Sequence, residues 1–257
     1  LGGSAANIAV AISRQNGHAA LLTAVSDDAV GRYTRRALDR YGVDTRFVRT
    51  VGGEARNSLA VVETRAENCQ SVIYRNDAAD FHLAAADAEA VDYSSFGAVI
   101  VTGTALAKEP SRSAAFAALR LAKQAGLTLV IDVDYRPYSW SSQAEAQQEC
   151  MRAVELCDIV VANDDEFAVL AGSESGLALA ERLSRAQGRL VVYKMGAKGC
   201  ITFTAGHSFE TPVFSVIALK NTGAGDGFMG GLMMGLDESA QISAAVRRGA
   251  ETAAIVV

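Results

Sequence analysis

The sequence of 257 residues has only three prolines, and no Pro-, Gly- or Ser-rich linker divides it. It has no apolar run near the ~20 residues that a membrane-spanning helix needs. No basic run appears either, and the formal net charge of −5 argues against a surface that binds nucleic acid. We therefore expect one domain, with neither a nucleic acid nor a membrane as its partner.

Cysteine and histidine are also scarce, with four and three residues. No C-x-x-C pair occurs and the histidines lie far from the cysteines, so a zinc site is not expected. Unpaired cysteines suit a reducing cytoplasm and no secretory signal is visible, so we expect a cytoplasmic protein. The motif G-x-x-x-x-G-K-[ST] is absent too, which argues against a P-loop nucleotide-binding protein.

What the sequence does contain is a regular alternation of short apolar runs and amphipathic segments. This alternation predicts an α/β fold, with a parallel sheet that helices cover on both faces. Ligands of such sheets bind at the carboxyl ends of the strands. Strands are expected at 98–102, 127–131, 159–162 and 190–194, and helices at 111–124, 143–156, 166–171 and 177–186.

The first part of the chain has a different pattern of predicted helices and strands. A helix is expected at 4–16, a short strand at 19–25 and a second helix from 27 to about 42. Two stretches rich in β-branched residues follow at 57–64 and 70–75, separated by a short polar segment. This pattern is typical of a β-hairpin, which interrupts the strand–helix alternation.

The most informative stretch runs from Asn221 to Gly231 and reads NTGAGDGFMGG. Its glycines let backbone N–H groups approach a phosphate, and the apolar segment that follows predicts a helix whose N-terminal end favours negative charge. Asp226 needs a separate reason, because a carboxylate repels phosphate. The role that fits is to take a proton from an alcohol while that alcohol attacks phosphorus.

Two other interpretations fit the same stretch. It can be a turn followed by an Asp that caps a helix. Gly225, Gly227 and Gly230 also match the G-x-G-x-x-G fingerprint of dinucleotide-binding folds. That fingerprint belongs within a strand–helix–strand unit, whereas a second helix is expected here, so the dinucleotide interpretation is disfavoured.

Polar residues follow the strand expected at 127–131. Asp132, Asp134 and Arg136 alternate along the chain, so an extended backbone would point them the same way. Two acids and one arginine can form a simple ion-pair cluster. Alternatively, Arg136 binds a phosphate or a substrate carboxylate through two parallel hydrogen bonds.

The next two expected strands also end in polar residues. Asn163 and Glu166 are three residues apart and would share one helical face, where their oxygens suit Mg²⁺ and its waters, although acids at a helix start are also ordinary caps. After 190–194, Gly196 and Gly199 let the backbone approach a ligand, and Lys194 can meet phosphate.

At the other end of the chain, Gly2 and Gly3 precede the first expected helix, and Asn7 lies near its start. The two glycines can form only a turn. They can also let a polyol lie against the backbone, with Asn7 donating a hydrogen bond to a hydroxyl.

In family order, these motifs resemble the signatures of the ribokinase-like (PfkB) carbohydrate kinases, and the resemblance covers nearly the whole chain. They match the C-terminal G-A-G-D signature, the early Gly-Gly…Asn signature, the N-x-x-E signature and the nucleotide-side glycine loop of that family. The matching stretches are 223–226, Gly2-Gly3 with Asn7, Asn163 with Glu166, and 194–199.

The resemblance implies a three-layer α/β/α fold with a mainly parallel central sheet and a small β lid. Residues 1–257 would form a single kinase domain, with residues 52–80 contributing to the lid. The first strand of the family fold would lie before Leu1, and its last strands would reach past Val257. ATP and Mg²⁺ are the cofactors that the resemblance implies.

Roles for individual residues also follow from the resemblance. Asp226 would be the catalytic base, beside an anion hole at Gly223, Ala224 and Gly225, and Glu166 would bind the metal through water. The remaining candidates are expected to bind the sugar (Gly2, Gly3, Asn7, Arg75 and Arg136) or the nucleotide (Asn163, Lys194, Gly196 and Gly199).

Stretches 74–80, 102–112 and 132–140 are similar to one group within the family, the kinases of 5-dehydro-2-deoxy-D-gluconate in myo-inositol catabolism. Lys220 also fits that group. This narrower resemblance implies transfer of the γ-phosphoryl group of ATP to the C6 hydroxyl of that sugar acid, with Arg75 reading its carboxylate.

Three alternatives stay open at this point. Kinases of 2-keto-3-deoxygluconate and of fructose also carry D-x-[ND]-x-R sequences, and a non-catalytic sugar- or nucleoside-binding protein on the kinase fold belongs to a different functional class. We also expect a homodimer, because open edges of lid strands favour pairing.

Overall fold

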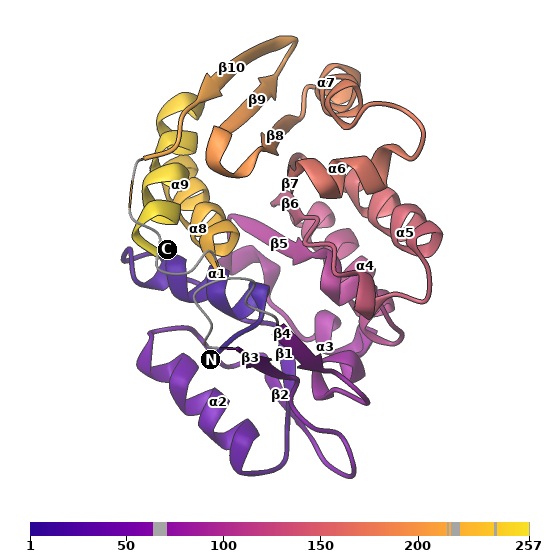
Figure 1. Cartoon of the computed structure of the whole chain (residues 1–257). Helices are drawn as coiled ribbons and strands as arrows, with labels where there is room; N and C mark the ends of the chain where they lie inside the picture. The colour runs from indigo at the N-terminus through magenta and orange to yellow at the C-terminus, as the bar shows by residue number, and fades with distance from the viewer. Residues whose placement is uncertain (64–70, 215, 217–221, 239–240, 257) are drawn as a thin grey trace.

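The structure, a computed structural model, is built around a central β-sheet (Figure 1). It describes residues 1–63, 71–214, 216, 222–238 and 241–256. Within these residues the sheet has six strands in the order β10-β9-β8-β7-β6-β5, of which β5 to β8 are parallel and β9 and β10 antiparallel. The strands are β5 (Ala98–Thr102), β6 (Thr128–Asp132), β7 (Ile159–Asn163), β8 (Leu190–Lys194), β9 (Cys200–Thr204) and β10 (His207–Thr211).

Helices cover both faces of the sheet, so the molecule has three layers (Figure 1). None in the described part of the chain is long and apolar enough to cross a membrane. One face carries α4 (Ser111–Gln124), α5 (Gln143–Leu156), α6 (Asp164–Ala171) and α7 (Gly176–Gln187), and the other α1 (Ser4–Ser13), α8 (Ala224–Asp237) and α9 (Ile242–Val256).

Alternation along the parallel strands explains the two-sided core. In β6, Leu129 and Ile131 pack into the cluster beneath α4 to α7, whereas Val130 packs into the cluster with α8 and α9. All three side chains are at most 1% exposed. A strand buried on both faces needs a continuous apolar run, which is why these runs could be recognised in the sequence.

A smaller region holds the part of the chain that follows α1 (Figure 1). Here β1 (Thr23–Ser26) pairs in parallel with β2 (Val48–Val51), and α2 (Ala29–Arg40) lies between them in sequence. Strand β1 is shorter than the expected 19–25, and β2 was not predicted. The remaining elements are α3 (Ala85–Glu89) and five short 3₁₀ helices, η1 (Ala79–His82), η2 (Tyr93–Ser95), η3 (Gly103–Leu106), η4 (Pro137–Ser139) and η5 (Gly196–Lys198).

The expected hairpin is present. Strands β3 (Leu59–Val62) and β4 (Ser71–Tyr74) pair antiparallel as a separate two-stranded sheet. The register places Leu59 opposite Tyr74 and Val61 opposite Val72, so these four side chains share one face, and each is more than half exposed. The hairpin therefore presents an apolar face that the described residues leave open to solvent.

Candidate active site

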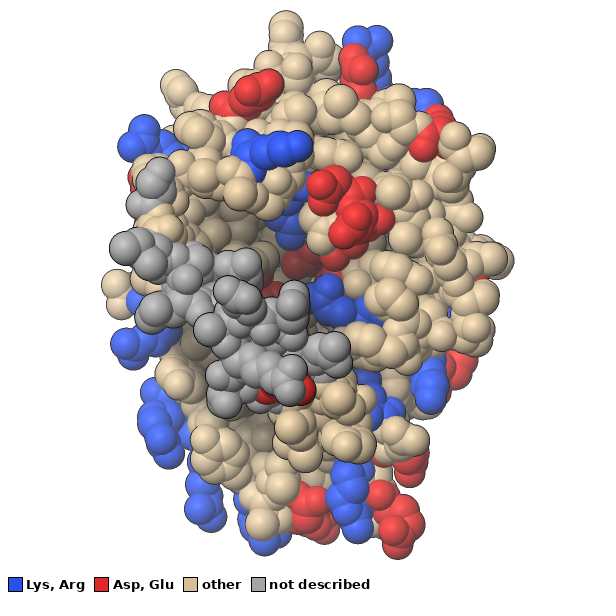
Figure 2. Space-filling model, in the orientation of Figure 1, with Lys and Arg blue, Asp and Glu red and all other residues tan. Residues whose placement is uncertain are grey.

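The site begins where the parallel strands end. Asp132, Asn163 and Lys194 are the last residues of β6, β7 and β8. Strands β7 and β8 pair Asn163 with Lys194, and β6 lies next to β7, so the three ends meet at one edge of the sheet. Figure 2 shows a hollow near the centre of one face, where charged side chains of both signs gather.

Asp226 approaches this edge from the start of α8. Gly223, with a φ of 94°, precedes the helix, and the first backbone hydrogen bond of the helix runs from Gly227 N–H to Gly223 O at 2.9 Å. The N–H groups of Ala224, Gly225 and Asp226 therefore lie outside the helical ladder. The interpretation of Asp226 as a helix cap is wrong, because Gly223 holds that position and no side chain caps the helix.

The carboxylate of Asp226 is partly buried and held by α1. Asn7 Nδ2 donates to Asp226 Oδ2 at 2.8 Å. Burial raises the pKa of Asp226 to about 6; the bond from Asn7 lowers it, nearby Asp134 and Asp132 raise it, and Lys194 lowers it. Asp226 is therefore a carboxylate at neutral pH, with far more proton affinity than an exposed Asp.

Lys194 lies between the acids and the start of α8. Its Nζ is 3.6 Å from Asp132 Oδ1 and 3.5 Å from where a Cβ on Gly225 would stand. Burial raises the pKa of Asp132, which is only 3% exposed. Burial also opposes the charge on Lys194, but Asp132 and Glu166 outweigh it and raise the pKa of the ammonium, so Lys194 is a fixed cation.

The loop after β6 forms an ion pair. Arg136 Nη2 is 2.6 Å from Asp134 Oδ1, which matches the ion-pair interpretation of this cluster. The backbone at Asp134 is not extended as expected, since its φ is 34°. Ser4 Oγ and Thr104 Oγ1 donate to Asp134 Oδ2 at 2.5 and 3.3 Å. Arg136 Nη1 donates to Tyr135 O at 3.2 Å, but the side chain stays 45% exposed, so its exposed part can meet a ligand.

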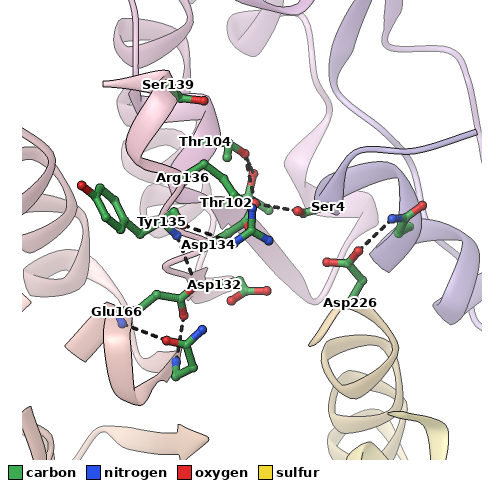
Figure 3. A network of polar contacts seen from close by, with 12 residues as sticks. Ser4, Thr102, Thr104, Asp132, Asp134, Tyr135, Arg136, Ser139, Glu166 and Asp226 are labelled. Carbon is green, nitrogen blue, oxygen red and sulfur yellow. Dashed lines mark hydrogen bonds and ion pairs between the residues drawn. The ribbon is translucent and has the colours of Figure 1, made fainter. Parts of the chain in front are cut away.

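Glu166 and Asn163 form a reciprocal capping box at the start of α6. Glu166 N–H donates to Asn163 Oδ1 and Asn163 N–H to Glu166 Oε2, both at 2.8 Å, and Tyr135 N–H reaches Glu166 Oε1 at 3.2 Å (Figure 3). Glu166 is 4% exposed, and burial raises its pKa to about 7. Each carboxylate oxygen thus already accepts a backbone N–H and retains one lone pair.

Arg75 follows β4 but does not stand free on the hairpin. Its guanidinium forms an ion pair with Asp80 and lies 3.9 Å above the ring of Phe81. Its Nη1 also donates to Thr104 O at 3.3 Å and to Ser139 Oγ at 3.4 Å. The residue therefore ties the hairpin to the loops that surround Asp134.

The glycines that were predicted to bind the sugar or the nucleotide differ in the space around them. A Cβ on Gly2, Gly3 or Gly196 would meet no atom within 4 Å, so these positions border open space. A Cβ on Gly199 would instead lie 2.2 Å from Thr211 O, and the φ there is 88°. Gly199 is thus required by packing between η5 and β10, whatever else it binds.

Sequence reasoning missed two hydroxyl donors of the site, Ser4 and Thr104. Ser4 is the first residue of α1 and Thr104 lies in η3, yet both reach the carboxylate of Asp134 (Figure 3). The sequence held a weak signal, since each immediately follows a glycine: Gly3 is the N-cap of α1 and Gly103 is the first residue of η3. Only the fold shows that they meet the same acid.

A separate cavity of about 680 Å³ lies between α4 and α5. Its lining includes Phe116 and Arg120 of α4 and Arg152 of α5, and none of the described candidate residues contributes to it. The chemistry assembled at the strand ends therefore lies elsewhere.

Comparison with known proteins agrees with the motifs. A family model described as pfkB family carbohydrate kinase matches residues 1–257. A protein of Photobacterium profundum named 5-dehydro-2-deoxygluconokinase is 37% identical over 263 residues, which cover 100% of this chain and 80% of the relative. A protein of the same name from Geobacillus kaustophilus is 34% identical and is covered to 78%.

Solved structures agree as well. The apo fructokinase of Vibrio cholerae superposes with a TM-score of 0.85 at 31% identity, covering 99% of this chain and 89% of that chain. A form of that enzyme with fructose, ADP and calcium bound gives a TM-score of 0.84 at 32% identity, covering 98% and 82%. These neighbours confirm the ribokinase-like α/β fold that the motifs predicted.

Proposed function

Because the chain belongs to the pfkB family of carbohydrate kinases and is an ATP-dependent sugar kinase, we propose that its acceptor is the C6 hydroxyl of 5-dehydro-2-deoxy-D-gluconate. The names of the relatives that are 37% and 34% identical support this substrate. The observation that carries the proposed mechanism is Asp226, a carboxylate of raised pKa beside N–H groups that lie outside the helical ladder at a helix start.

In this proposal Asp226 accepts the proton of the sugar hydroxyl while the hydroxyl oxygen bonds to the γ-phosphorus. The bond from that phosphorus to the β,γ-bridging oxygen breaks, and ADP leaves. The N–H groups of Ala224, Gly225 and Asp226 donate to the phosphoryl oxygens at the positive end of the helix dipole. Lys194 adds a fixed positive charge beside Gly225.

The nucleotide would lie along Asn163, Lys194 and the turn from Gly196 to Gly199. In the described part of the chain, no group of three or more His, Cys, Asp or Glu could hold a metal ion. Glu166 suits Mg²⁺ only through water, since both its oxygens already accept backbone N–H groups. Mg²⁺ bound with ATP would neutralise phosphate charge.

The substrate carboxylate would be bound by Arg136, which stays partly exposed beside Asp134, with Arg75 contributing from its contact with Thr104 O. Gly2, Gly3 and Asn7 would line the sugar. We propose that residues 1–257 act as one kinase domain, with residues 52–80 as its lid. Closure of such a lid would exclude water and suppress hydrolysis of ATP.

A substrate panel tests the acceptor. ADP release should be measured with Mg-ATP and 5-dehydro-2-deoxygluconate, 2-keto-3-deoxygluconate or fructose. The first acid should give the highest kcat/KM, and Arg136→Gln should raise KM for acids more than for fructose. A control is Arg182→Gln, which removes a surface ion pair with Glu174. A preference for fructose, or equal effects of Arg136→Gln on acids and fructose, would overturn the proposed substrate.

A second experiment tests the base. Asp226→Asn keeps the shape and should lower kcat by ~10²–10⁴-fold, the usual contribution of a general base. Asp237→Asn is the matched control, because Asp237 is an exposed acid at the other end of α8. Turnover near wild type in Asp226→Asn would remove the role of Asp226, and no ADP release from wild type with any sugar would favour the non-catalytic alternative.

The apolar face of the β3–β4 hairpin supports the expected homodimer, because paired copies would cover it. Light scattering of wild type and of a Val61→Lys/Val72→Lys variant tests this. A wild-type monomer would contradict the expectation.

A further inference from the structure

Helices α1 and α8 lie in unusually close contact. A Cβ on Gly230 would stand 2.4 Å from the Cβ of Ala11 and 3.2 Å from its carbonyl carbon, so only glycine fits there. One turn earlier on each helix, Asn7 meets Asp226 at 2.8 Å. The two contacts are four residues apart on both helices, so α1 and α8 run in the same direction with one register.

We propose that Asn7 is a positioning residue for the catalytic base, and that the Ala11–Gly230 contact sets the helix spacing that lets its amide reach Asp226. Asn7 holds Oδ2, which leaves Oδ1 to accept the proton of the sugar hydroxyl. This inference rests on the proposed role of Asp226. It assigns Asn7 a task in addition to the sugar contact expected from the sequence.

The electrostatic surroundings show why such a donor matters. Burial and two nearby acids oppose the charge on Asp226, and the Asn7 amide acts against them by stabilising the ionised form. On the described part of α9, the residues nearest to Gly223 and Gly227 at the start of α8 are the uncharged Thr252 and Val256. Among the described residues, the charged groups that act on Asp226 are Asp132, Asp134 and Arg136 from β6 and its loop, and Lys194 from β8.

Two substitutions of Asn7 separate positioning from sugar binding. Asn7→Leu is close in size and removes the donor, whereas Asn7→Asp is isosteric and places a second carboxylate 2.8 Å from the first. A residue that only binds sugar would raise KM and leave the pH dependence of the reaction unchanged. A positioning residue would move the acid limb of the pH profile.

The test is the pH profile of kcat/KM for the sugar at saturating Mg-ATP, from pH 5 to 9. Relative to wild type, the acid limb should move up by about one unit in Asn7→Leu, the size expected for a lost hydrogen bond to a charged group. It should move further in Asn7→Asp. Asn7→Leu should regain activity toward pH 9. An unmoved limb in both folded variants would overturn the proposal.

A second pair of variants tests the helix spacing while Asn7 and Asp226 stay unchanged. Gly230→Ala should push α1 away and move the limb in the same direction, and Ala11→Gly/Gly230→Ala should move it part of the way back. A limb that stays at the wild-type pH in folded Gly230→Ala would overturn the role of this contact. Circular dichroism and urea unfolding establish that each variant is folded.

Asp226→Asn distinguishes failure of the proposed function from failure of the positioning role alone. If Asp226→Asn keeps wild-type turnover, the proposed function loses its base and the positioning role falls with it. If Asp226→Asn is inactive and the limb does not move in the Asn7 variants, only the positioning role is wrong.

Discussion

Removing the charge of Asp226 should stabilise the folded protein, although the same substitution greatly lowers kcat. Burial raises the pKa of this carboxyl from 3.8 to about 6, so the folded state binds its proton more tightly than the unfolded state does. At roughly 1.4 kcal/mol per pKa unit, the ionised side chain costs up to about 3 kcal/mol above pH 7. Asp226→Asn is isosteric and removes this cost.

The sign of the pH dependence follows directly. Because the folded pKa is the higher one, the wild type is relatively most stable when Asp226 is protonated, and it loses this stability as the pH rises through about 6. The advantage of Asp226→Asn should thus be up to about 3 kcal/mol at pH 8 and about half of that at pH 5. Turnover of the wild type should fall over the same range as the pH decreases.

Urea unfolding at pH 8 and pH 5 measures the difference, with Asp237→Asn as the control that should change little at either pH. For a chain of this size, up to about 3 kcal/mol corresponds to a rise in Tm of roughly 6–10 °C. The reasoning is refuted if Asp226→Asn is no more stable than wild type at pH 8, or if its advantage grows as the pH decreases.

Two further sets of substitutions probe the Lys194–Asp132 ion pair and the packing at Gly199. Lys194→Met should lower the free energy of unfolding by about 2–3 kcal/mol, measured with urea, because it leaves Asp132 buried without its cation. Adding Asp132→Asn should restore part of this loss. If the effects of the two substitutions simply add, the two residues are not coupled. Gly199→Ala should cost at least about 2 kcal/mol by meeting Thr211 O, whereas Gly196→Ala, in open space, should cost about 1 kcal/mol; equal costs would contradict the packing argument.

The sequence predicted those parts of the fold that depend on local pattern. The helices at 111–124 and 143–156 and the strands at 98–102 and 190–194 have the expected bounds, because burial on both faces or on one helical stripe leaves a clear periodicity. Strands β9 and β10 were missed. In β10 most side chains are exposed, so its residues carry no apolar run.

The site was predictable where one residue sits at a strand end or helix start. Asp226, Glu166 and Lys194 were proposed in this way, and the structure brings them toward one edge of the sheet, since the topology of a parallel sheet gathers such positions. What the sequence could not show are contacts between distant segments. The bond from Asn7 to Asp226 spans 219 residues, and that from Ser4 to Asp134 spans 130. The spacing of apolar and polar residues within one segment does not predict such contacts.

The surroundings of Arg75 also depend on contacts that the sequence pattern does not show. The resemblance implied that Arg75 reads the sugar-acid carboxylate, but it did not show that the fold brings Phe81 beneath the guanidinium and Asp80 beside it. An arginine held in this way is preoriented, and only 16% of its side chain is exposed. If Arg75 binds the sugar acid, the ligand must share its guanidinium with Asp80. Arg136 also pairs with an acid, but more of its side chain is exposed to a ligand.

The charge balance of the site connects stability with function. Among the residues that the structure describes, four acids meet there with two cations, and burial raises the pKa of three of the acids, which are Asp132, Glu166 and Asp226. Such an arrangement destabilises the fold when every acid is ionised, and an unaccompanied polyphosphate would be repelled by it. A nucleotide that brings its own cation reverses this repulsion. The excess of buried acid is therefore costly to the empty protein and favourable to the substrate complex, which is the distribution expected at an active site rather than in a structural ion-pair network.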